Sequence, residues 1–131
     1  MTKYFTWSEF DKSVDYIANH CKKLKISGIY GVPRGGLCLA VALSHKLNIQ
    51  LFEQPFKSSL IVDDVYETGF TLSNYKNIED ANFFVLVSKK RPIWWNTVNL
   101  SHENEWIVFP WENSENELNE KKEFKNKRGL R

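Results

Sequence analysis

The sequence lacks several features on which common classes of function depend. It has only two cysteines, Cys21 and Cys38, which are too few for a disulfide framework. Its formal net charge is only +2, from 18 Lys and Arg against 16 Asp and Glu, so it lacks the strongly basic composition of proteins that bind nucleic-acid polymers. The first residues, MTKYFTWSEF, form neither a signal peptide nor a membrane segment. These absences predict a cytoplasmic protein that binds neither a nucleic-acid polymer nor a membrane.

Apolar side chains are plentiful enough for one folded domain. The chain has 131 residues, of which 42% are hydrophobic, with 9 Phe, 5 Trp and 5 Tyr. This length leaves no room for a separate substrate domain. The last twenty residues contain 5 acids and 6 bases and few apolar side chains. We therefore expect a folded domain over residues 1–111 and a charged C-terminal tail over 112–131, solvated or, as the less favoured alternative, loosely docked as a helix.

The spacing of apolar residues predicts alternating helices and strands. Thr6 and Glu9 have the spacing of a capping box, which begins a helix. Buried strands are expected at 29–32, 60–62 and 83–87, a second helix after residue 36, and edge strands at 94–98 and 106–109. This order predicts an α/β fold with an open, mostly parallel sheet flanked by helices on both faces. The inward-facing residues of the two helices are expected to be Phe10, Val14, Ile17, Cys21 and Leu24, then Leu37, Ala40, Val41, Leu43 and Leu47.

Two polar loops follow predicted strands, where an open parallel sheet binds its ligands. In the first loop, GVPRGG at 31–36, the glycines permit close approach and Arg34 can bind phosphate oxygens, although a plain strand-to-helix turn has the same composition. In the second loop, Thr68 to Thr71 offer hydroxyls and free amides to an anion. Asp63 and Asp64 would repel that anion, so we expect them to face ribose hydroxyls, a magnesium ion or both. Acids that only cap a strand end are the structural alternative.

The segment LIVDDVYETGFTL, from Leu60 to Leu72, closely resembles the signature for phosphoribosyl pyrophosphate (PRPP) in type I phosphoribosyltransferases. In that family a loop like Val32–Gly36 receives the pyrophosphate, often with a strained or cis peptide. WIVFPW, from Trp106 to Trp111, is similar to the WIxxPW segment of the xanthine-guanine branch, and Lys89 falls where that branch has its base-recognising lysine. The resemblance, which spans residues 29–111, implies the type I phosphoribosyltransferase fold with a small, truncated hood.

The resemblance also implies a role for each matching residue. Asp63 and Asp64 would hold the ribose hydroxyls, and Asp64 would contact the expected cofactor, Mg²⁺. These two aspartates and Glu67 are the catalytic candidates. Lys89 would donate to the purine six-position oxygen, Trp106 would cover the base, and the Ile107 backbone would meet its two-position edge. The residues expected to bind PRPP are Arg34, Gly35, Asp63, Asp64, Glu67, Thr68, Gly69, Phe70 and Thr71.

The reaction implied is transfer of phosphoribose from PRPP to guanine, xanthine or hypoxanthine with release of pyrophosphate, by a homodimer or homotetramer. Three departures from the family pattern bear on it. Glu67 stands where the purine branch commonly has aspartate, and Phe70 stands where glycine is frequent. The connection from Gln50 to Ser59 replaces a long flexible loop that usually closes over PRPP. Two alternatives therefore stay open: a non-catalytic PRPP or nucleotide sensor, and transfer to a pyrimidine or another base.

Overall fold

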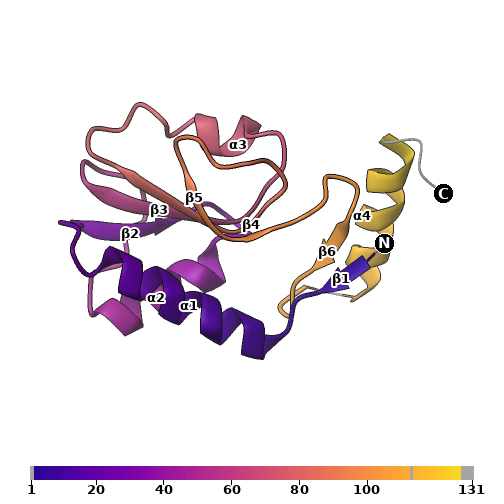
Figure 1. Ribbon diagram of the computed structural model, residues 1–131, viewed down its shortest axis with the longest axis horizontal. Coiled ribbons are helices and arrows are strands. Elements are labelled where there is room, and N and C mark those ends of the chain that lie inside the picture. Colours follow the sequence, from indigo (N-terminus) through magenta and orange to yellow (C-terminus); the bar gives the residue numbers. More distant parts are fainter. Residues whose placement is uncertain (1, 113, 128–131) are drawn as a thin grey trace.

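The computed structural model describes residues 2–112 and 114–127, which form a four-stranded parallel sheet and a smaller projecting unit (Figure 1). Strands β2, β3, β4 and β5 pair in that order, all parallel, so the predicted α/β fold with an open parallel sheet is confirmed. Strands β1 and β6 form a separate parallel pair. The elements are β1 (Thr2–Tyr4), α1 (Trp7–Cys21), β2 (Gly28–Gly31), α2 (Leu37–Leu47), β3 (Ser59–Tyr66), α3 (Phe70–Ser73), β4 (Asn82–Ser88), β5 (Asn96–Leu100), β6 (Trp106–Val108) and α4 (Ser114–Lys127).

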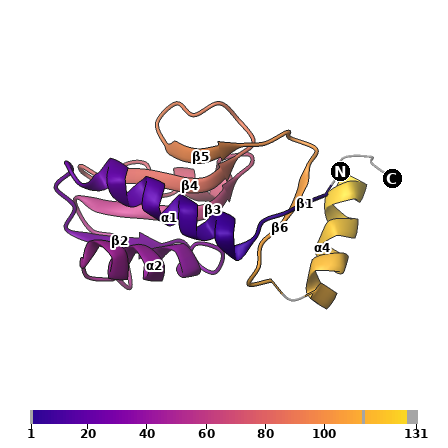
Figure 2. The same cartoon turned by 60° about the horizontal axis from the view of Figure 1, so that its bottom comes forward.

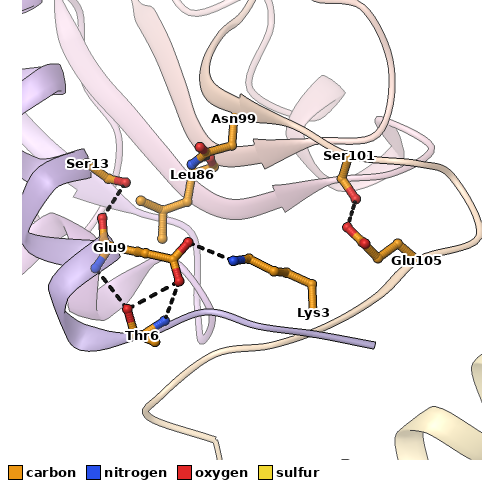
Figure 3. Close-up of polar contacts among 8 residues, drawn as sticks. All are labelled: Lys3, Thr6, Glu9, Ser13, Leu86, Asn99, Ser101 and Glu105. Carbon is orange, nitrogen blue, oxygen red and sulfur yellow. Dashed lines mark hydrogen bonds and ion pairs between the residues drawn. The ribbon is translucent and has the colours of Figure 1, made fainter. Parts of the chain in front are cut away.

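Helix α1 begins at the predicted capping box. The Glu9 amide donates to Thr6 Oγ1 at 3.1 Å and the Thr6 amide donates to Glu9 Oε1 at 3.3 Å (Figure 3). The predicted inward faces are right in the middle of the helices and wrong at three positions. Leu24 is exposed because α1 ends at Cys21, and Leu37 and Val41 are exposed because α2 turns Leu39, Ala40 and Leu43 toward the sheet.

Alternate residues of the strands enter two different cores. On one face Leu60 and Phe84 pack under α1 and α2, and on the other Ile61 and Phe83 pack with Leu72 and Trp95. Helices α1 and α2 lie on the same side of the sheet in Figures 1 and 2. Helices therefore flank the sheet on both faces, but the second face has only the single turn of α3, together with the chain leading to β4 and two tryptophan rings.

The projecting unit consists of β1, β6 and α4, and we call it the hood (Figures 1 and 2). Strand β6 was expected at an edge of the main sheet, but it pairs instead with β1, in the register Lys3↔Ile107. The sequence did not reveal β1, because three residues carry too little of an alternating pattern.

The predicted charged tail forms helix α4, the docked alternative, so the preference for a solvated tail is wrong for residues 114–127. Phe124 is 6% exposed and its ring lies 5.0 Å from that of Trp106, centroid to centroid. Residues 113 and 128–131 of the predicted tail lie outside the described residues. In the part of the chain that is described, no helix is both long enough and apolar enough to cross a membrane.

Candidate functional site

A cavity of about 340 Å³ opens at the carboxyl ends of β2 and β3. Every residue expected to bind PRPP lines it except Arg34, whose side chain is exposed on the first loop. The structure therefore brings the two predicted loops to one cavity. The described residues that line it are Pro33, Gly35, Asp63, Asp64, Val65, Tyr66, Glu67, Thr68, Gly69, Phe70, Thr71 and Leu72.

The acid pair lies within β3, near its end, and the strand continues beyond it to Tyr66. The Asp64 amide donates to Asp63 Oδ1 at 2.8 Å, and the Val65 amide donates to Asp64 Oδ1 at 2.7 Å. Burial raises the pKa of Asp63 to about 8, and the adjacent charge of Asp64 adds to this effect. Burial also raises the pKa of Asp64. Two buried acids that resist ionisation would be stabilised as anions by a cation beside them.

This donor set fits Mg²⁺, which binds proteins through one or two carboxylates and keeps water or substrate phosphate oxygens as its other ligands. Among residues 2–112 and 114–127, no group of three or more His, Cys, Asp or Glu side chains could hold a metal alone. Asp64, with Asp63 beside it, could supply carboxylate ligands to such an ion, whose other ligands would come from water or a bound phosphate.

The first loop presses against the acid pair. A Cβ at Gly35 would collide with the Asp64 carboxylate, so only glycine lets the backbone come this close. The Val32 amide donates to the Val62 carbonyl at 2.9 Å, and the Gly36 amide donates to the Val32 carbonyl at 2.8 Å. The peptide between Pro33 and Arg34 is cis, as the resemblance implied.

The second loop turns at Gly69, whose φ of 83° favours glycine. A Cβ there would also collide with the Tyr66 hydroxyl, and the Tyr66 ring stacks on Trp95 with centroids 3.7 Å apart. The Phe70 amide donates to Thr68 Oγ1 at 3.3 Å, and Phe70 is 80% exposed although it belongs to the lining of the cavity. Because α3 is a single turn, the loop offers an anion its amides and hydroxyls and little helix dipole.

The residues predicted for the base lie beside this cavity but do not line it. Lys89 follows β4, and its amide donates to the Tyr66 carbonyl at 2.8 Å. Its Nζ forms an ion pair with Glu67 Oε1 at 2.8 Å and donates to the Glu105 carbonyl at 2.6 Å. Trp106 and Ile107 lie in β6 of the hood. The structure thus joins Lys89 to Glu67 and keeps Trp106 and Ile107 on a separate element.

Polar contacts connect the hood to the core (Figure 3). Lys3 Nζ of β1 lies 2.9 Å from Glu9 Oε2 of α1. In the chain between β5 and β6, Ser101 Oγ donates to Glu105 Oε1 at 2.7 Å, which fixes the residue whose carbonyl receives Lys89. Sequence reasoning missed Glu105 because a backbone carbonyl carries no residue signature.

Sequence reasoning also missed Tyr66 and Phe124. Tyr66 lies inside the segment that resembles the PRPP-binding signature. An aromatic residue among acids and small residues was the signal that could have revealed it. Phe124 was visible only as a lone aromatic in a charged segment. Its ring lies over Lys89, with Nζ 4.3 Å from the ring centroid.

No family model and no curated protein matches this sequence, whereas solved structures match it over most of its length. Purine phosphoribosyltransferase from Pyrococcus horikoshii is 28% identical, with a TM-score of 0.73 over 86% of this chain and 95% of that one. The chain has the type I phosphoribosyltransferase fold, and the matches to solved structures support the family that the sequence signature indicated.

Two further matches have the same phosphoribosyltransferase fold at lower identity. Xanthine-guanine-hypoxanthine phosphoribosyltransferase from Helicobacter pylori is 17% identical, with a TM-score of 0.73 over 92% of this chain and 99% of that one. A hypothetical protein from Neisseria gonorrhoeae with bound ppGpp is 15% identical, with a TM-score of 0.67 over 98% of this chain and 97% of that one. The matches cover 95%, 99% and 97% of the three solved chains, so their folds correspond to that of this chain over nearly their whole length.

Proposed function

We propose that the protein is a magnesium-dependent phosphoribosyltransferase that moves phosphoribose from PRPP to an oxopurine and releases pyrophosphate. The observation that carries this proposal is the single cavity at which the buried Asp63–Asp64 pair, Gly35 and the Thr68–Thr71 loop converge. Each supplies what one part of PRPP needs: carboxylates for the ribose hydroxyls, backbone for the pyrophosphate, and amides with hydroxyls for the 5′-phosphate.

The reaction breaks the bond between sugar C1 and pyrophosphate and forms a bond from C1 to a ring nitrogen of the base, which loses a proton. The departing group carries negative charge away from an oxocarbenium-like sugar. Mg²⁺ at Asp64 would neutralise part of that charge. The protein's own contribution is to hold PRPP at three points and to keep the Glu67 carboxylate near the base as an acceptor for its proton.

The preference for an oxopurine rests on Lys89. An ammonium group donates hydrogen bonds and accepts none, so it pairs with a six-position oxygen and not with the amino group that adenine has there. Two similar structures carry the names purine and xanthine-guanine-hypoxanthine phosphoribosyltransferase, which supports the purine class of base.

A base panel tests the proposal directly. PRPP, Mg²⁺ and one base at a time (guanine, hypoxanthine, xanthine, adenine or orotate) are incubated with the protein, and nucleotide and pyrophosphate are both quantified. We expect product with one or more of the first three bases, and none from a protein with Asp63→Asn and Asp64→Asn. Product only with adenine or orotate would contradict the oxopurine assignment, and no product at high protein concentration would contradict catalysis.

A second candidate is a non-catalytic PRPP or nucleotide sensor on the same fold. It is favoured by the short connection before β3, where Leu51 makes a single bridge to Ile29 and Ser59 already begins the strand. The Neisseria gonorrhoeae protein of the same fold has bound ppGpp, which is consistent with a nucleotide-binding role. Calorimetry that detects magnesium-dependent PRPP binding, together with no turnover in the base panel, would favour the sensor.

A further inference from the structure

The Phe124 ring of α4 lies on Lys89, which the proposed function assigns to the base, and on Trp106, which the resemblance assigns to it. It is 5.0 Å from the Trp106 ring, centroid to centroid, and its centroid is 4.3 Å from Lys89 Nζ. Both distances are those of direct contact. A flat base needs about 3.5 Å on each of its faces, so no base fits between Phe124 and either side chain.

Lys89 is fully engaged in this arrangement. An ammonium group has three donors. Glu67 Oε1 and the Glu105 carbonyl accept two of them, and the Phe124 ring covers the cation on a further side. The Lys89 side chain is 2% exposed. It cannot reach the six-position oxygen of a base unless one of these partners withdraws.

Phe124 is the partner best able to withdraw. Among residues 118–126 of α4, it is the only side chain that is buried, while Leu118 on the same helix is 57% exposed. Helix α4 contacts β6 and is otherwise rich in charged residues. Glu67 and the Glu105 carbonyl belong to the core and to a loop fixed by Ser101. Over residues 118–126, Phe124 supplies the one buried side chain, and a segment with few buried apolar contacts opens more readily than the core of the sheet.

We propose that Phe124 is a built-in occupant of the base site, so that α4 must leave Lys89 and Trp106 before a purine can bind. This inference rests on the proposed function. The protein would then inhibit its own binding of the base and not its binding of PRPP, because none of the described residues of α4 lines the PRPP cavity. The apparent affinity for the base is lowered by the fraction of molecules in which α4 has withdrawn.

Calorimetric titration with guanosine, xanthosine and inosine 5′-monophosphates tests the proposal. Phe124→Ala should bind the preferred nucleotide about tenfold more tightly than the natural protein, because the competing ring is gone. Leu118→Ala, on the same helix but exposed, should bind it as the natural protein does. PRPP affinity should be the same in all three. Equal or weaker nucleotide binding by Phe124→Ala would overturn the proposal while leaving the proposed function intact, whereas no nucleotide binding by any protein would overturn both.

Two measurements do not depend on how well the variant folds. In the natural protein without ligand, Lys89 should resist an amine-reactive reagent, quantified by peptide mass spectrometry, while exposed Lys90 reacts; equal reactivity would mean that Phe124 does not cover Lys89. Hydrogen exchange of the α4 amides should become faster when the nucleotide is added to the natural protein. Slower exchange would show that α4 is a wall of the occupied site, which contradicts displacement.

Discussion

The proposed function divides the site into a phosphate half, at the cavity around Asp63, Asp64 and the Thr68–Thr71 loop, and a base half, around Lys89 and β6. These two halves are held in different ways. The phosphate half is formed by β2, β3 and the loops that follow them, so backbone pairing within one sheet fixes it. The base half combines the end of β4, the chain around Glu105, β6 and α4, and side-chain contacts connect these parts. The ion pair from Lys3 to Glu9 that also joins the hood to the core is partly exposed and therefore contributes little.

This difference indicates that the two halves respond to different perturbations. The phosphate half is open and preorganised, so changes there should alter PRPP affinity directly. The base half is covered by a helix, so changes there should alter base affinity and leave PRPP affinity alone. A substitution in one half that changed the affinity for the other half's ligand would show that the two halves are coupled.

The largest expected effect follows from removing the acid pair. Asp63→Asn with Asp64→Asn should weaken PRPP binding more than about a hundredfold in calorimetry with Mg²⁺, because both the ribose acceptors and the metal ligand are lost. Asp11→Asn, an exposed acid on α1, is the control and should bind PRPP normally. Protection of Lys89 from the amine reagent should be unchanged. Unchanged PRPP affinity in the double variant would remove the central premise of the phosphate half.

Gly35→Ala should have the next largest effect. The added Cβ collides with the Asp64 carboxylate, and a displacement of about 1 Å costs on the order of a hundredfold where geometry is tight. We expect PRPP affinity to fall between about tenfold and a hundredfold. Gly28→Ala is the matched control, because its Cβ collides with the Phe52 ring away from the cavity and should lower the melting temperature without changing PRPP affinity. Equal PRPP affinity in the two variants would contradict the role of Gly35.

The phosphate half was largely predictable from the sequence because its chemistry is local. Asp63 to Thr71 are consecutive, and a strand end followed by Thr-Gly-x-Thr determines its own backbone path. The cavity these residues line agrees with the prediction, although their roles toward PRPP stay predictions. Arg34 shows the limit of local reasoning: its position in the loop was right, but the direction of its long side chain depends on neighbours distant in the sequence.

The base half was less predictable because it depends on contacts between distant segments. Residues 106–108 pair with residues 2–4, and no pattern within either segment specifies its partner. Phe124 reaches Lys89 across 35 positions of the chain, and the charge of the surrounding segment favoured a solvated tail. Phe124 is the one buried side chain among residues 118–126, and the average composition of a segment does not reveal a single buried contact.

Lys89→Ala changes the base half and should leave the phosphate half as it is. We expect affinity for the preferred purine nucleotide to fall about tenfold, which corresponds to one lost hydrogen bond from a charged donor. PRPP affinity should stay within about twofold. Lys90→Ala is the control, since Lys90 is adjacent but exposed and should leave both affinities unchanged. A large loss of PRPP binding in Lys89→Ala would mean that the Lys89–Glu67 ion pair supports the phosphate half as well.

The smallest expected effect is on the free energy of unfolding. It comes from the cost of ionising the buried Asp63 carboxyl when no metal is bound. The folded protein keeps the Asp63 proton until its raised pKa of about 8, whereas the unfolded chain loses it near pH 4. Between these values the unfolded state binds fewer protons, so the free energy of unfolding decreases as the pH rises. Asparagine at this position does not titrate. Urea unfolding in EDTA should therefore show the natural protein losing about 1 kcal/mol relative to Asp63→Asn between pH 6 and pH 7.

The free energy of unfolding of Asp11→Asn should change with pH as that of the natural protein does, because Asp11 is exposed. If the free energy of unfolding of Asp63→Asn changed with pH in the same way, the Asp63 carboxyl would already be ionised in the folded protein. The acid pair would then need no cation to keep both charges. If the difference appears and Mg²⁺ removes it, the ion stabilises the ionised pair before PRPP arrives. That result would sharpen the contrast between a phosphate half completed by a ligand from outside and a base half occupied by the protein's own phenylalanine.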